Sequence, residues 1–193
     1  KCKHPEVVVK LAKRLKKQKY NFHIKMLGTG KLEEKTRKKV KKLGLEDVLE
    51  IVGQVPSDKV KDYMEKANIF IGTSDSQEGW GAVINESMNA ACALVANKKM
   101  GSVPFLIKDG ETGLIYTTYK ELEEKVKLLI NNKELRCKLG KNAYTYITEK
   151  WTGSVAANNL IELFDSIINK KEYKIKEGPA SKEEGRKNGK KKI

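Results

Sequence analysis

Cysteine is scarce in this chain of 193 residues, and long apolar runs are absent. Its three cysteines, Cys2, Cys92 and Cys137, are odd in number and widely spaced. This argues against a disulfide framework or a zinc site and fits a reducing cytoplasm. No 18-residue apolar stretch occurs, so the sequence predicts no membrane-spanning helix. The chain begins at Lys1 without a methionine or an apolar leader, and we expect it to be a later domain of a longer protein.

Acidic residues are also in the minority, with 25 against 40 lysines and arginines, for a net charge of +15 at pH 7. Residues 1–50 hold 16 basic and 6 acidic side chains, residues 51–170 hold 15 of each, and residues 171–193 hold 9 and 4. Solvated helix faces account for most such lysines; attraction of anionic substrates or of an anionic membrane surface is the alternative. Aromatic residues are not interleaved with the basic ones, so the pattern does not favour a nucleic-acid partner.

Apolar runs typical of β-strands alternate with amphipathic helical patterns along the chain. Strands are predicted at residues 21–27, 48–52, 69–72, 93–96 and 114–116, with helices between most of them and three more after residue 118. This alternation predicts a Rossmann-like three-layer α/β/α fold with a parallel sheet of about six strands. We expect one domain over residues 1–170 and a basic tail over residues 171–193 that is disordered or forms an extended arm.

The stretch IFIGTSDSQEGWGAVINESMNAACALVA, residues 69–96, is the most informative part of the chain. It reads as strand, loop, helix and strand, and in a parallel sheet such a loop lies at the carboxyl edge, where ligands of α/β folds bind. Glycines beside Glu78 and Trp80 let the backbone approach a ligand, and the amides of a helix start suit a phosphate. Glu86 follows within the helix. The alternative for Glu86 is that it only interacts favourably with the helix dipole. The alternative for Trp80 is that its ring only packs in the core.

The string E-G-W-G-A-V-I-N-E, from Glu78 to Glu86, resembles the E-x(7)-E signature of retaining GT-B glycosyltransferases that use nucleotide-sugars. The resemblance continues through S-M-N-A-A-C-A-L-V-A and V-P-F-L-I-K-D-G-E-T-G-L-I-Y, and covers residues 1–165 in the family's element order. It implies one half of a GT-B fold, the C-terminal domain that binds the donor. The N-terminal domain, which would hold the acceptor, is absent here, and the helix over residues 152–169 would pack on it.

The resemblance also assigns roles to individual residues. It implies that Glu86 binds the ribose hydroxyls of the donor and that Glu78, the catalytic candidate, contacts the sugar near its reacting end. Backbone amides of the helix start would bind the diphosphate, Lys3 would add charge, the turn at Gly28 would lie near the phosphates, and Val55 would contact the base. The donor-binding candidates are therefore Lys3, Gly28, Val55, Gly79, Trp80, Gly81, Ala82, Val83 and Glu86. Lys3 can equally be an unstructured terminal residue, and the Gly28 turn a plain strand-to-helix turn.

The family requires no bound metal or other cofactor, and the nucleotide-sugar is a substrate, a UDP-sugar being favoured over a GDP-sugar. The implied reaction is retaining transfer in polysaccharide or glycoconjugate synthesis, in the cytoplasm or at the inner face of the membrane. This chain alone would transfer little. Two alternatives stay open: a nucleotide-binding α/β domain that does no chemistry, and a basic module for nucleic acid or a membrane surface. Ala91, Ala93 and Phe105 depart from the family's usual Gly, Pro and Glu, which leaves the donor sugar open.

Overall fold

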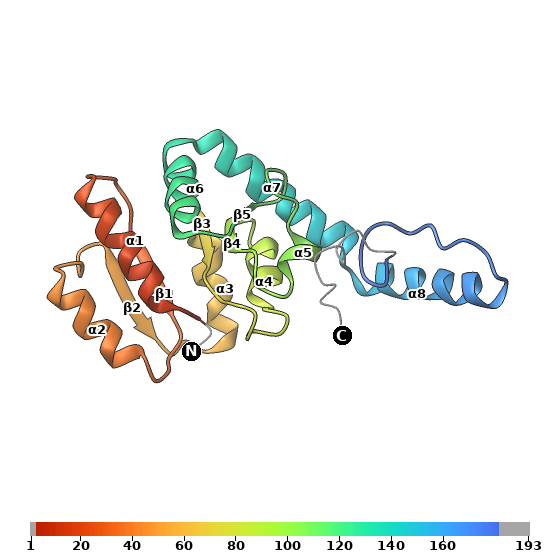
Figure 1. The fold of residues 1–193 in the computed structure, drawn as a ribbon, viewed down its shortest axis with the longest axis horizontal. Helices are drawn as coiled ribbons and strands as arrows, with labels where there is room; N and C mark the ends of the chain where they lie inside the picture. Colours follow the sequence, from red (N-terminus) through yellow and green to blue (C-terminus); the bar gives the residue numbers. More distant parts are fainter. Residues whose placement is uncertain (1–2, 182–193) are drawn as a thin grey trace.

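The computed structural model describes residues 3–181, whose helices and strands alternate along the first two thirds of the chain (Figure 1). The elements are α1 (Pro5–Lys17), β1 (Ile24–Leu27), α2 (Glu33–Lys42), β2 (Leu49–Gly53), α3 (Ser57–Lys66), β3 (Ile69–Gly72), α4 (Val83–Asn89), β4 (Ala93–Asn97), α5 (Val103–Leu106), β5 (Leu114–Tyr116), α6 (Tyr119–Asn131), α7 (Lys133–Lys150) and α8 (Gly153–Ile168). The predicted order is confirmed; the one-turn helix α5 was not predicted, because four residues carry no helical period.

The strands form two parallel sheets, and this corrects the expected single sheet of about six strands. In the described part of the chain β1 pairs with β2, and β3, β4 and β5 pair in that order. No ladder joins β1 to β3. The fold class itself is confirmed as Rossmann-like α/β, because every pairing is parallel and helices cover both faces.

Helix α1 packs against both sheets. Its residues Leu11 and Leu15 belong to a core cluster with β4, β5 and α6, whereas Val9 and Ala12 pack with α2 and the strands β1 and β2. A third cluster joins α4, α5 and α7 to the other face of β4. Strand β4 therefore lies at the centre of the layers, and its first four residues are at most 1% exposed.

Local sequence determines where the later helices begin. The side chains of Thr118, Asn132 and Thr152 accept hydrogen bonds from the backbone N–H groups of Glu121, Leu135 and Val155, three residues on in each case. This is the usual way to satisfy an N–H group in the first turn of a helix. These caps place α6, α7 and α8 within a residue or two of the ranges that the sequence predicts.

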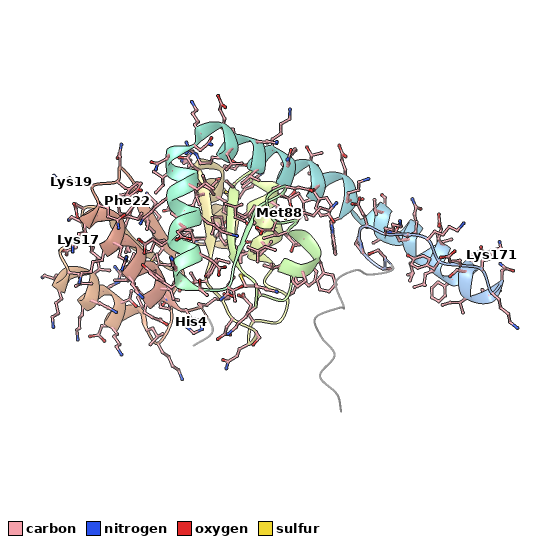
Figure 2. The ribbon with its side chains drawn as sticks, turned by 45° about the horizontal axis from the view of Figure 1, so that its top comes forward. His4, Lys17, Lys19, Phe22, Met88 and Lys171 are labelled. Carbon is pink, nitrogen blue, oxygen red and sulfur yellow. The ribbon has the colours of Figure 1, made fainter. Side chains whose placement is uncertain are left out.

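Helix α8 extends from the rest of the molecule as an arm, with Lys171 at its far end (Figures 1 and 2). The segment after it corrects part of the predicted disordered tail, because residues 171–181 fold back along α8. The Asn159 amide donates to the carbonyls of Glu177 and Pro179, and Glu177 pairs with Lys108. The rest of the predicted tail, residues 182–193, lies outside the described residues. Along residues 3–181, every helix is too short or too polar to cross a bilayer.

The turn after α4 holds a strained residue. Ala91 has φ 54°, a left-handed conformation that costs a non-glycine residue about 1–2 kcal/mol. It lies at the end of α4, where the left-handed residue that closes a helix is usually glycine. Alanine at position 91, where the family usually has glycine, therefore lowers the stability of the folded protein.

We predict that Ala91→Gly raises the free energy of unfolding by about 1 kcal/mol, because glycine adopts positive φ without steric cost. Urea denaturation followed by circular dichroism measures the change. Ala90→Gly is the matched control: Ala90 has φ −86°, so glycine there should lower stability by up to about 1 kcal/mol. Equal changes for the two variants would contradict the interpretation.

Candidate functional site

The loop between β3 and α4, residues 73–82, meets the amino-terminal turn of the chain at the carboxyl edge of β3. The Lys3 ammonium donates a hydrogen bond to Glu78, and the Thr73 hydroxyl donates to the Lys3 carbonyl at 2.5 Å. The structure thus joins two predicted site residues that are 75 positions apart. Lys3 therefore lies at the candidate site and contacts it through both its side chain and its backbone.

Glu78 is placed as a ligand-binding carboxylate would be. Its side chain is 13% exposed, and one of its two oxygens binds Lys3. The other oxygen, Oε2, is buried and has no hydrogen-bond partner among residues 3–181. Burial is the largest single effect and favours the neutral acid, but the hydrogen bonds from Lys3 and Ser74 and the charge of Lys3 together outweigh it and lower the pKa of Glu78 below its ordinary value. The carboxylate is therefore ionised at neutral pH.

A second ion-pair cluster ties the same two segments together. His4 Nε2 lies 2.7 Å from Asp75 Oδ2, and His4 Nδ1 lies 3.0 Å from Glu6 Oε1 (Figure 2 labels His4). These two hydrogen bonds raise the pKa of His4 above its ordinary value of 6.5, and His4 in turn lowers the pKa of Asp75. Lys99 adds to the lowering for Asp75. The imidazolium thus links the start of α1 to the loop that carries Glu78.

The glycine-rich turn after Glu78 has its carbonyl groups directed at the start of α5. The Trp80 carbonyl accepts from the Ser102 N–H at 2.8 Å, and the Gly81 carbonyl accepts from the Ser102 hydroxyl at 3.4 Å. Gly101 packs against the Gly79 carbonyl so closely that a Cβ on Gly101 would lie 1.7 Å from its oxygen. In a trans peptide the N–H points opposite to the carbonyl.

It follows that the N–H groups of Trp80, Gly81 and Ala82 point away from α5. None of these three N–H groups has an acceptor within the described part of the chain. Gly81 adopts φ +80°, which explains the need for glycine at this position. The result is a run of directed amide donors beside an ionised glutamate, an arrangement that suits an anion such as a phosphate.

Glu86 and Trp80 lie on either side of this turn. Glu86 is exposed and lies one helical turn after Ala82, on the face of α4 opposite the buried Ile84 and Met88. The Trp80 ring is 39% exposed, contacts Phe105 and Trp151, and donates from Nε1 to Asn85. Trp80 therefore helps to hold the turn in shape, and Val83 is partly buried at the start of α4.

The two remaining predicted residues lie at the same edge of the fold but on the other sheet. Gly28 follows β1 with φ +108°, and its N–H donates to the Gly53 carbonyl at 2.7 Å. Val55 follows β2 and is partly buried. The structure therefore brings together Lys3, Glu78 and the glycine turn, and it places Gly28 and Val55 across the break between the sheets. No group of three or more His, Cys, Asp or Glu side chains in residues 3–181 is arranged to hold a metal ion.

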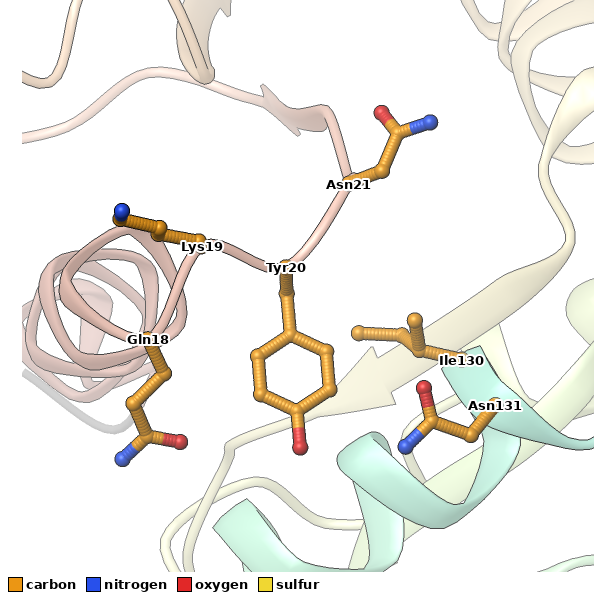
Figure 3. Close-up of a pocket in the computed structure, with 6 residues that line it drawn as sticks. All are labelled: Gln18, Lys19, Tyr20, Asn21, Ile130 and Asn131. Carbon is orange, nitrogen blue, oxygen red and sulfur yellow. The ribbon is translucent and has the colours of Figure 1, made fainter.

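A hollow of about 470 Å³ lies at the opposite, amino edge of the fold (Figure 3). It lies between the α1–β1 loop and the end of α6, where Tyr20 projects beside Ile130 and Asn131. This hollow has no ionised acceptor or directed amide run, and ligands of parallel α/β folds bind at the carboxyl edge. We therefore assign the candidate site to the loop after β3.

Sequence comparison identifies the class of protein. Residues 1–146 match the family described as Glycosyl transferases group 1, and the chain belongs to this family. It is 35% identical over 124 residues to an uncharacterised glycosyltransferase of Methanocaldococcus jannaschii, covering 63% of this chain and 34% of that protein. The chain thus spans about a third of the length of this relative.

Solved structures of GT-B glycosyltransferases share the fold. TarM of S. aureus, in complex with UDP, aligns with a TM-score of 0.75 at 22% identity, over 86% of this chain and 34% of TarM. The C-terminal domain of a group 1 glycosyltransferase (LpcC) from Francisella tularensis aligns with a TM-score of 0.67 at 24% identity. That alignment covers 77% of this chain and 80% of the LpcC domain. These structures confirm the expected fold, which is one half of a GT-B fold.

Sequence reasoning missed two groups of residues at the site. His4 and Asp75 are separated by 71 positions, and no local pattern pairs them. Ser102 and Gly101 orient the glycine turn from a distant loop. The sequence gives one sign of this second group. In the string G-S-V-P before Phe105, the two small residues Gly101 and Ser102 interrupt the apolar pattern.

We predict that the imidazole of His4 titrates above pH 6.5, because the hydrogen bonds to Asp75 and Glu6 favour its charged form. The stabilisation from the hydrogen bonds of charged His4 with Asp75 and Glu6 is fully present below pH 6.5. It is lost as pH rises through the raised pKa of His4. Nuclear magnetic resonance titration measures it, with His23, the only other histidine, as internal reference.

Asp75→Asn should lower the pKa of His4 more than Glu6→Gln does, because the hydrogen bond to Asp75 is the largest cause of the shift. Three further charged groups act on Glu6 or Asp75 in this cluster: Lys39 of α2 on Glu6, and Lys99 and Glu78 on Asp75. A pKa of His4 at or below 6.5 in the folded protein would show that His4 does not form these hydrogen bonds with Asp75 and Glu6 in solution.

Proposed function

We propose that this chain is the donor-binding half of a retaining glycosyltransferase that uses a nucleotide-diphosphate sugar, with a UDP-sugar favoured. The observation that carries the proposal is the joint placement of Glu78, Lys3 and the outward amides of residues 80–82 at one edge of the fold. Membership of the glycosyltransferase family and the likeness to TarM, a protein solved with UDP, support it.

The diphosphate of the donor would bind at the glycine turn. Its charge would be balanced by the amides of Trp80, Gly81 and Ala82 and by the Lys3 ammonium, which is 60% exposed and able to change partner from Glu78 to a phosphate. A single directed donor of this kind lowers the barrier for a departing anion by about 3–4 kcal/mol. No metal ion is then needed to neutralise the leaving diphosphate.

The two glutamates would bind opposite ends of the donor. Glu78, an ionised carboxylate whose side chain is 13% exposed, would accept a hydrogen bond from the sugar near its reacting carbon. Glu86, exposed on the outer face of α4, would accept hydrogen bonds from the ribose hydroxyls. Gly28 and Val55 would contact the phosphates and the base from the other sheet, and the backbone at Gly79 and Val83 would complete the site.

The acceptor would be held by an N-terminal domain of the same protein. Helix α8 supports this division, because five of its apolar residues are between 44% and 76% exposed: Leu160, Ile161, Phe164, Ile167 and Ile168. An exposed apolar surface of this size is typical of an interface. We also propose that the protein acts in polysaccharide or glycoconjugate synthesis in the cytoplasm, where its basic surface would favour an anionic membrane. The chain alone would bind donor and transfer little.

A nucleotide-binding domain without chemistry is the second candidate. It would share the amide turn and Glu86, but it would not need an ionised carboxylate at the position of Glu78. The full-length protein separates the two candidates. Transfer from a UDP-sugar, with the anomeric configuration kept in the product by nuclear magnetic resonance, supports the transferase; nucleotide binding without transfer supports the alternative.

We predict that Glu86→Ala weakens UDP binding by about 2 kcal/mol, roughly thirtyfold in Kd, because a charged acceptor of the ribose hydroxyls is lost. Glu78→Ala should leave the affinity for UDP within about threefold and weaken the intact UDP-sugar. Isothermal titration calorimetry with UDP and with the UDP-sugar measures both.

Glu124→Ala is the matched control, because Glu124 is an exposed glutamate on α6, away from the candidate site. It should change neither affinity. Equal losses of UDP affinity in the Glu78 and Glu86 variants would contradict the assigned roles, and no loss in either would remove the glutamates from the donor site.

A further inference from the structure

The ring of Trp80 lies on the α5 side of the glycine turn, which is the side opposite its outward amides. The centre of this ring is 5.4 Å from that of Phe105 and 5.9 Å from that of Trp151, with the ring planes tilted by 37° and 42°. Aromatic pairs attract one another at such distances and tilts. The amide donors and the aromatic contacts therefore belong to one turn, and a shift of Trp80 would move the donors with it.

Trp151 lies at the joint between α7 and α8. It directly follows the last residue of α7, and its backbone N–H donates to the Ile147 carbonyl at 3.3 Å. Its ring packs against the core cluster of α4, β4, α5 and α7. The indole Nε1 is buried and has no acceptor within residues 3–181. The position of the ring therefore depends on packing and on the path of the chain at the joint.

The return segment, residues 171–181, is built onto one face of α8 and leads back to this joint (Figure 1). Asn159 of α8 is 7% exposed, and its amide donates to the carbonyls of Glu177 at 3.1 Å and Pro179 at 2.9 Å. The Tyr173 hydroxyl lies 3.2 Å from the Asn159 carbonyl. A buried amide with both of its N–H donors used fixes the return segment in one place.

Glu177 of the return segment connects the joint to the core. One oxygen of its carboxylate binds the ammonium of Lys108, two residues after α5, and the other lies 3.9 Å from that of Lys150, the last residue of α7. The hydrogen bond from Lys108 lowers the pKa of Glu177 below its ordinary value. Gly178 packs so closely that a Cβ there would lie 2.6 Å from the Lys150 carbonyl oxygen. The residue before Trp151 is thus held through its side chain and its backbone.

We propose that Trp151 is a positioning residue for the glycine turn, and that Glu177 holds Trp151 in place from the return segment. Trp151 touches no ligand; it supports the Trp80 ring from behind. A turn supported in this way keeps the amides of residues 80–82 in one orientation before an anion arrives, so that little ordering is needed on binding. The effect on donor affinity rests on the proposed function, whereas the effect on the turn does not.

The Ser102 N–H reports on the turn without any ligand, because it donates to the Trp80 carbonyl at 2.8 Å. Trp151→Ala should quicken hydrogen exchange at Ser102 by about tenfold relative to the amides of β4, which report global unfolding. Trp151→Phe keeps an aromatic ring at the joint and should stay within about twofold of the unchanged chain. Nuclear magnetic resonance measures both.

Val126→Ala is the matched control for lost core packing. Val126 is 3% exposed on α6 and belongs to the core cluster that α6 forms with α1, β4 and β5. The variant should quicken exchange at Ser102 no more than at the amides of β4. An equal relative rise in Val126→Ala and Trp151→Ala would overturn the proposal, because Trp151 would then act only as a packed core residue.

Glu177→Gln tests the return segment, since it keeps the size of the side chain and removes its charge. It should quicken exchange at Ser102 by about threefold, and Glu124→Gln on α6 should not. Unchanged exchange at Ser102 in Trp151→Ala or in Glu177→Gln would overturn the proposal. If Trp151→Ala does not fold, Glu177→Gln still decides the outcome.

Titration with UDP by calorimetry connects this positioning role to the proposed function. Trp151→Ala should weaken UDP binding by about tenfold, and Trp151→Phe should stay within about threefold of the unchanged chain. Unchanged UDP affinity in folded Trp151→Ala would overturn the proposal. An unchanged chain that does not bind UDP would contradict the proposed function instead, and exchange at Ser102 would still decide the role of Trp151.

Discussion

The conformation of the candidate site depends on one close approach, between Gly101 and the carbonyl of Gly79. No side chain fits there, because a Cβ would meet the carbonyl oxygen at 1.7 Å. With the N–H and hydroxyl of Ser102 holding the next two carbonyls, the three peptide planes of the turn have a single orientation. Planarity of the peptide bond then directs the amides to the opposite side. The outward direction of the amides in this turn is thus set by a neighbouring loop.

Electrostatics joins this turn to the beginning of the chain. Lys3 neutralises Glu78, and His4 bridges Asp75 and Glu6, so two adjacent residues of the amino-terminal turn each pair with the β3–α4 loop. Such a site is preorganised, because its charges are balanced before a ligand arrives. In the proposed function, an incoming diphosphate would take over the Lys3 ammonium and leave the Glu78 carboxylate to accept a hydrogen bond from a hydroxyl. The strongly basic first 50 residues would favour the approach of that anion.

Two surfaces of the chain leave apolar side chains or strand edges without a partner among residues 3–181. The apolar stripe of α8 is exposed along an arm that leaves the core (Figure 1). The edges of β1 and β3 are unpaired beneath α1, and α3 buries none of its residues. Apolar stripes and open strand edges are costly to leave in water, because they bind other chains without selectivity.

The sequence by itself determined the order of the elements, the carboxyl-edge loop at Glu78 and the family, because periodicity, helix caps and a contiguous string are local properties. The tertiary structure alone decided the rest. Strand pairing is non-local, so the alternation could not show that β1 and β3 stay unpaired. The positive φ of Ala91 arises in the turn between α4 and β4, and the sequence marked this position only as a departure from the glycine that the resemblance implies. His4 and Asp75 meet only because α1 begins beside the loop after β3, an adjacency that exists only once the chain has folded.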